Sequence, residues 1–97
     1  MAYDPGAIEA ALAAAVGDEP ALIAELRGAF IDSVQRGVDG LDAARDHEGW
    51  QAAAFRLKGL AASFGAVRLM ALAIEAADAP AQDQGVLRRI KRTVERL

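Results

Sequence analysis

The chain has 97 residues, a length typical of a single domain, and no linker-like segment divides residues 1–97 into two. It has no cysteine and one histidine, His47, which excludes a disulfide framework, a thiolate site and a histidine-based metal site, so we expect no metal and no cofactor. A formal net charge of −3 argues against a general nucleic-acid-binding protein.

A short first helix is predicted near the N-terminus. Asp4-Pro5 combines a capping residue with proline at the first helical position. Ile8 and Leu12 then follow at helical spacing, and Gly17 ends the pattern.

The second predicted helix is long. Asp18-Glu19-Pro20 repeats the start signal, and apolar or small residues then recur at spacings of three and four. This stripe predicts a helix that ends near His47. Its inward-facing members are Leu22, Ile23, Leu26, Phe30, Val34, Gly37, Leu41 and Ala44.

Three more helices complete the expected fold. The third spans about 48–64, with Gly65 as its C-terminal cap, the fourth spans about 66–77 before Pro80, and the fifth spans about 82–97. Each has apolar residues on one face, and the connections are short. This pattern predicts an all-α fold, an up-and-down antiparallel four-helix bundle with a short extra N-terminal helix.

Charge is distributed unevenly along the chain. Residues 1–50 contain ten acidic and three basic residues, whereas residues 51–97 contain four acidic and eight basic residues. Five of the basic residues lie in the last helix: Arg88, Arg89, Lys91, Arg92 and Arg96. A solvated helix face is the simpler interpretation of this cluster. A small adaptor that binds nucleic acid or an acidic protein through it is the alternative.

The N-terminal segment and the hydropathy pattern bear on location. No basic stretch followed by an apolar core opens the chain, and no uninterrupted apolar run reaches the length of a membrane span. We therefore expect a cytoplasmic protein that does not contact a membrane.

An aromatic residue lies on the outer face of the third predicted helix. At roughly 100° per residue, Phe55 falls about 160° from Leu57, which belongs to the inward stripe, so its ring is expected to face solvent. Five residues fall within about 60° of it on the helical wheel. They are Gln51, Ala52, Lys58, Gly59 and Ala62.

This outer face has the composition of a docking surface. A large ring is bordered by small residues, with the cations Arg56 and Lys58 nearby, as at interface centres where an aromatic anchor fills a pocket and charges steer the approach. Gly59 adds to this, because glycine inside a helix costs roughly 1 kcal/mol relative to alanine. Close packing between helices is the alternative explanation for Gly59.

The segment Ala54-Phe55-Arg56-Leu57-Lys58-Gly59, followed by Ala61-Ala62-Ser63-Phe64-Gly65-Ala66, resembles the phosphorylation segment of histidine-containing phosphotransfer (HPt) domains. In that family a histidine precedes the Lys-Gly pair by three residues and carries the phosphoryl group. Here Phe55 occupies that position, and Leu60 replaces a residue that is commonly small and polar. A phenyl ring has no lone pair for attack on phosphorus, so we expect no phosphotransfer activity.

The resemblance implies a partner and a role. It predicts that the chain, as a monomer, binds the receiver domain of a response regulator or a histidine kinase without carrying phosphate, and so acts as a competitor, scaffold or regulator. The partner-binding residues would be Phe55, Lys58, Gly59, Arg56, Gln51, Ala52 and Ala62. An inactive variant of a working phosphotransfer protein is the alternative. His47 lacks the Lys-Gly surroundings and is not expected to be phosphorylated.

Overall fold

A computed structural model describes residues 5–17 and 19–97, and this part of the chain is all-helical, as predicted. The predicted capping residues Asp4 and Asp18 lie outside the described residues. The helices are α1 (Pro5–Val16), α2 (Pro20–Ala43), α3 (His47–Ser63), α4 (Val67–Asp78) and α5 (Gln84–Glu95).

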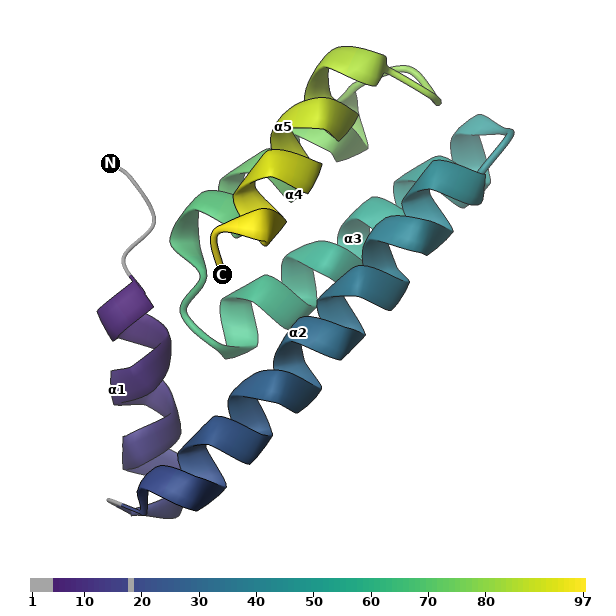
Figure 1. Cartoon of the computed structure of the whole chain (residues 1–97). Helices are drawn as coiled ribbons and strands as arrows, with labels where there is room; N and C mark the ends of the chain where they lie inside the picture. The colour runs from purple at the N-terminus through teal and green to yellow at the C-terminus, as the bar shows by residue number, and fades with distance from the viewer. Residues whose placement is uncertain (1–4, 18) are drawn as a thin grey trace.

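Successive helices reverse direction along the chain (Figure 1). Helix α3 packs against α2 and α4, and α5 packs against α4 and α2. The 24-residue α2 is the longest of the described helices. Its N-terminal part projects beyond α3, α4 and α5, and α1 packs against this projecting part (Figure 1). This arrangement leaves one side of α3 without a helical neighbour.

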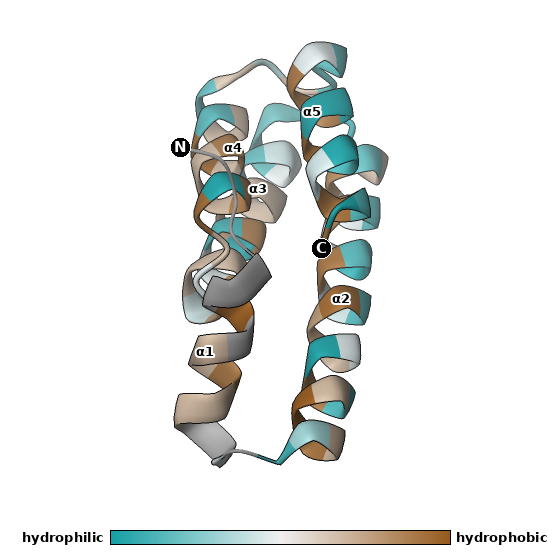
Figure 2. Ribbon diagram, turned by 60° about the vertical axis from the view of Figure 1, so that its left-hand side comes forward, coloured by the Kyte–Doolittle hydropathy of each residue, from teal (hydrophilic) through white to brown (hydrophobic). Residues whose placement is uncertain are grey.

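Apolar side chains from all five helices form one continuous core, and the hydrophobic residues of α2 are turned toward its neighbours (Figure 2). The rings of Phe30 and Phe64 pack against each other at an angle of 35°, with their centroids 4.4 Å apart, and join α2 to the end of α3. The largest fully buried side chains are Trp50, Phe30, Ile8, Leu41, Leu57, Leu69, Leu87, Ile90, Val34 and Val86.

The predicted inward stripe of α2 is correct for most of its length and wrong at its start. Leu22 is 37% exposed, because the neighbouring Ile23 takes the inward direction and the two residues lie about 100° apart on the helix. Val38 is buried although it was not among the predicted core positions. It follows the buried Val34 by four residues, the spacing of one helical turn.

Two helix boundaries differ from the sequence prediction. Helix α2 ends at Ala43 rather than near His47, because the Asp46 side chain caps α3 by accepting a hydrogen bond from the Gly49 amide at 2.7 Å. His47 is therefore the first residue of α3. Helix α5 likewise begins two residues later than predicted, where Asp83 accepts a hydrogen bond from the Val86 amide. The predicted cap Gly65 has a φ of +69°.

The connection between α4 and α5 is tied to the end of α2 by a single side chain. Gln82 Nε2 donates hydrogen bonds to the carbonyl oxygens of Asp42, at 3.0 Å, and Ala44, at 2.5 Å. These carbonyls lie at the C-terminus of α2, where no intrahelical amide reaches them. The backbone of Gln82 is in the left-handed region, with a φ of 64°.

We expect Gln82→Ala to destabilise the protein by about 1–2 kcal/mol, because the Ala44 carbonyl loses its donor, the Asp42 carbonyl keeps only the bond from Arg45 Nη1, and the left-handed backbone remains. Gln82→Gly also removes the donor but relieves the backbone, and it should cost about 1 kcal/mol less. Urea unfolding followed by circular dichroism measures both values. Equal stabilities for the two variants would contradict the backbone part of the prediction.

Helices α4 and α5 are joined on their exposed sides by an ion pair between Glu75 and Arg89. The hydrogen bond from Arg89 lowers the pKa of Glu75, and the same bond raises the pKa of Arg89. Because the folded-state pKa of Glu75 lies below its unfolded value, the pair stabilises the fold above that unfolded value and loses this effect as the pH falls through the folded pKa.

Arg89→Gln should therefore raise the pKa of Glu75, as measured by NMR titration of its side-chain carboxyl carbon. Arg92→Gln removes the same charge from α5 without touching the pair and serves as the control. An unchanged Glu75 titration in the Arg89 variant would show that the ion pair does not persist in solution.

Candidate functional site

The outer face of α3 is exposed, as the helical wheel predicts. Phe55 is 53% exposed, while Trp50 and Leu57 on the opposite face are fully buried. Ala52, Gly59 and Ala62 surround the ring and are also exposed. The ring therefore stands above a base of small residues, with nothing larger than a methyl group on these three neighbours.

The three longer polar residues of the predicted site differ in their contacts. Lys58 is half-buried, and its Nζ lies 5.9 Å from the centroid of the Phe55 ring, within cation–π range. Gln51 Nε2 donates to the carbonyl oxygen of Ala77 at 3.3 Å, which ties it to α4. Arg56 is exposed on the side of α3 toward α2. Lys58 and Arg56 thus place positive charge on both sides of the ring.

Gly59 has open space where a side chain would begin. A Cβ atom built on it meets no other atom within 4 Å. This contradicts close helix packing as the reason for glycine here. Gly37 on α2 is different, since a Cβ there would come 3.3 Å from Leu57 Cδ1. The freedom at Gly59 is compatible with close approach of another molecule.

We expect Gly59→Ala to stabilise the isolated protein by about 0.5–1 kcal/mol, because it removes the helical cost of glycine without creating a clash. Gly28→Ala is the matched comparison, since Gly28 lies inside α2 and its surroundings are equally open. Thermal unfolding of both variants measures the effect. A loss of stability in Gly59→Ala alone would show a packing role for that glycine.

The sequence pattern does not distinguish two exposed apolar side chains on α4 from the buried ones. Val67 is 56% exposed and Ile74 is 43% exposed, whereas Leu69 and Ala73 between them are buried. Helices α3 and α4 run antiparallel, and the Gln51–Ala77 bond sets their register. Counting one turn along each helix places Ile74 at nearly the same height as Phe55. Helix α4 therefore exposes an apolar side chain at about the height of Phe55.

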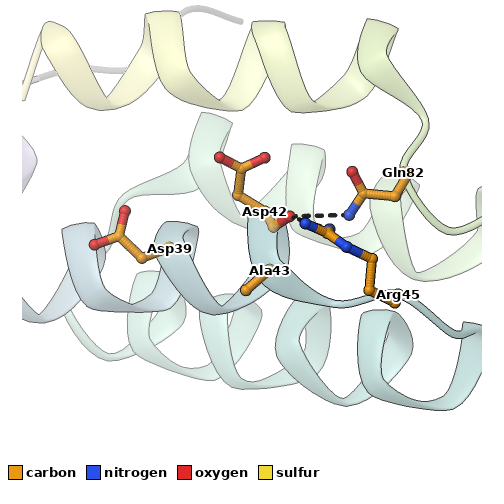
Figure 3. A pocket seen from close by; sticks show the side chains of 5 residues that line it. All are labelled: Asp39, Asp42, Ala43, Arg45 and Gln82. Atoms are coloured by element: carbon orange, nitrogen blue, oxygen red, sulfur yellow. Dashed lines mark hydrogen bonds between the residues drawn. The ribbon is translucent and has the colours of Figure 1, made fainter.

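An open pocket of about 490 Å³ lies at the far end of α2 (Figure 3). Its lining residues are Asp39, Asp42, Ala43, Arg45 and Gln82. Most of the polar groups there bind one another: Arg45 and Gln82 both donate to the Asp42 carbonyl, and the Asp42 carboxylate pairs with Lys91 at 3.1 Å. No group of three or more residues suited to hold a metal ion occurs in the described part of the chain. Because these polar groups are already engaged within the chain, the pocket is a weaker candidate for a binding site than the outer face of α3.

The basic cluster of α5 is partly neutralised within the chain. Arg89 pairs with Glu75, and Lys91 pairs with Asp42. Arg88, Arg92 and Arg96 remain exposed. Two of the five cations are thus already engaged, which weakens the interpretation of α5 as a phosphate-binding surface.

His47 is remote from the other predicted site residues. It is exposed at the start of α3, eight residues before Phe55, which corresponds to about 12 Å along a helix axis. The structure does not bring it to the α3 face.

The described helices include none that is both long enough and apolar enough to span a lipid bilayer. Comparisons with protein-family models, with curated proteins and with solved structures give no match for this chain.

Proposed function

We propose that the protein is a degenerate HPt domain that binds a receiver domain or a histidine kinase through α3 and carries no phosphate. The observation that supports this most directly is the position of Phe55. It replaces the histidine of an HPt-like segment and is 53% exposed at the centre of a surface of small residues. The nucleophile is missing, whereas the surface that would surround it is present.

The helix arrangement supports the same proposal at the level of the fold. Contacts between α2 and α3, α3 and α4, α4 and α5, and α5 and α2 close a ring of four helices. An up-and-down four-helix bundle of the HPt type, with α1 as an extra N-terminal helix, accounts for this ring. In such a bundle the phosphorylation position lies on the outer side of one helix, as Phe55 does.

Regulation would then depend on whether this protein occupies the docking surface of the receiver or kinase. The Phe55 ring enters an apolar pocket on the partner, the partner backbone comes close to α3 over Gly59, and Lys58 and Arg56 steer the approach. A receiver held in this way is unavailable to an active phosphotransfer protein. The proposal requires a monomer in the cytoplasm, where receiver domains and kinases meet. An inactive variant of a working relay protein would retain the same surface, since Lys58 and Gly59 are present.

The test is an NMR titration of isotope-labelled protein with receiver domains and kinases from its own organism. Amide shifts should concentrate between Gln51 and Ala62. Phe55→Ala should weaken binding by about 30-fold or more, the effect of losing an interface hot spot. Leu22→Ala removes another exposed apolar side chain, 37% exposed and outside the α3 face, and should leave the affinity unchanged. Absence of binding at high micromolar concentrations, or shifts confined to other helices, would contradict the proposal.

A further inference from the structure

A groove between α2 and α3 lies beside the outer face of α3 that carries Phe55, and it has a volume of about 280 Å³. The lining residues from α2 are Ser33, Arg36 and Gly37, and those from α3 are Arg56, Leu57 and Leu60. Leu57 is buried and Leu60 is half-buried, so the floor is apolar. Two arginines border a small apolar groove that is open to solvent.

Neither arginine has an acidic partner among the described residues. Arg36 Nη2 donates to Ser33 Oγ at 3.2 Å, and Arg56 forms no hydrogen bond or ion pair in the described part of the chain. Asp32 and Asp39 lie within one turn of Arg36 on α2, yet neither pairs with it. Among the other exposed cations, Arg89 and Lys91 are paired across helices, whereas Arg88 and Arg92 form no ion pair within the described residues. The groove is thus lined by two guanidinium groups that form no ion pair within the described residues.

The groove is continuous with the predicted docking surface. Phe55 and Arg56 are neighbours in sequence and lie about 100° apart on the helix. Ala52 and Gly59 occupy the angle between them, and both are exposed. A molecule seated on the ring therefore reaches the groove across small residues only.

Because it combines two guanidinium groups with an apolar floor, the groove suits an anionic group carried on a short apolar stem. A guanidinium forms paired hydrogen bonds with a carboxylate, and such bonds are strengthened where apolar atoms displace water. The Leu57 and Leu60 side chains suit the methylene groups of an aspartate or glutamate. We infer that the Arg36–Arg56 groove takes a carboxylate side chain of the protein that docks on Phe55, which makes the two arginines determinants of partner choice. This inference rests on the proposed function.

The experiment compares two double variants that remove equal charge. Arg36→Gln with Arg56→Gln should weaken binding of the receiver or kinase by about tenfold, the loss of a partly exposed charge-assisted contact. Arg88→Gln with Arg92→Gln removes two exposed cations from α5 and should change the affinity less than twofold. In the unaltered protein, the side-chain Nε–H signals of Arg36 and Arg56 should shift on binding, while those of Arg88 and Arg92 stay in place.

The outcomes separate this inference from the proposed function. If the partner binds and Phe55→Ala weakens it, but both double variants behave alike, the groove has no specific role and the inference is overturned alone. A charge exchange gives a positive test, in which Arg56→Glu loses affinity and a lysine in place of one acidic partner residue restores it. Arginine signals that respond to a phosphorylated partner only would identify a phosphoryl group instead of a carboxylate. If no receiver or kinase binds the unaltered protein, the inference and the proposed function fail together.

Discussion

If the proposed function is correct, Phe55→His is expected to convert the chain into a phosphoryl acceptor. The side chain at this position is exposed, so an imidazole there can reach the aspartyl phosphate of a docked receiver. Its ring nitrogen would attack phosphorus, the bond to the aspartyl oxygen would break, and the carboxylate would leave while the imidazole loses its proton to solvent. Lys58 already lies beside this position, with its Nζ 5.9 Å from the centroid of the ring that would be replaced. Its charge would offset that of the arriving phosphoryl group.

The measurement is the transfer of labelled phosphate from a phosphorylated receiver, with phosphohistidine identified by its stability in alkali and lability in acid. Ala52→His is the matched control, because it places an exposed histidine on the same face one turn away and should remain unlabelled. Phe55→His combined with Lys58→Ala should accept phosphate more slowly than Phe55→His alone. A folded Phe55→His protein that binds the receiver but never becomes labelled would contradict the proposal of an HPt-like phosphorylation site around residue 55.

Helix order and most of the core follow from periodicity in the sequence, because an apolar stripe at helical spacing reports which side of a helix is covered. Boundaries were harder to predict. The apolar pattern of α2 continues through Ala44, but the Asp46 carboxylate bonds to the Gly49 amide and starts a new helix there. A capping residue shortly after an apolar stripe was the available signal for this break.

The outward direction of Phe55 could be predicted because it depends on one helix alone. The Arg36–Arg56 groove could not, because it exists only where α2 and α3 are placed side by side. Gly37 permits that placement, since Leu57 Cδ1 would lie 3.3 Å from a Cβ at this position. Val67 and Ile74 are similar cases, because a helix rich in apolar residues does not reveal which of them its neighbours cover.

Trp50→Ala is expected to cost about 3–5 kcal/mol of stability, the largest effect of any single substitution considered for this fold. Trp50 is fully buried in α3, and its Nε1 donates to the carbonyl oxygen of Ala76 in α4 at 2.7 Å. That oxygen also accepts a hydrogen bond from the Ala79 amide at 3.0 Å, so it keeps a partner when the indole is removed. The cost therefore comes mainly from the cavity left between α3 and α4. It is a large share of the roughly 5–15 kcal/mol that stabilises a typical domain.

Urea unfolding followed by circular dichroism measures this effect, because the substitution removes the only tryptophan and with it the fluorescence signal. A midpoint lower by roughly 2 M is expected. Trp50→Phe keeps most of the volume and should lose much less stability. Phe55→Ala is the contrasting control on the opposite face of α3 and should change stability by no more than about 0.5 kcal/mol. If Trp50→Ala and Phe55→Ala proved equally mild, the assignment of inner and outer faces of α3 would be wrong, and the docking surface built on it would have to be abandoned.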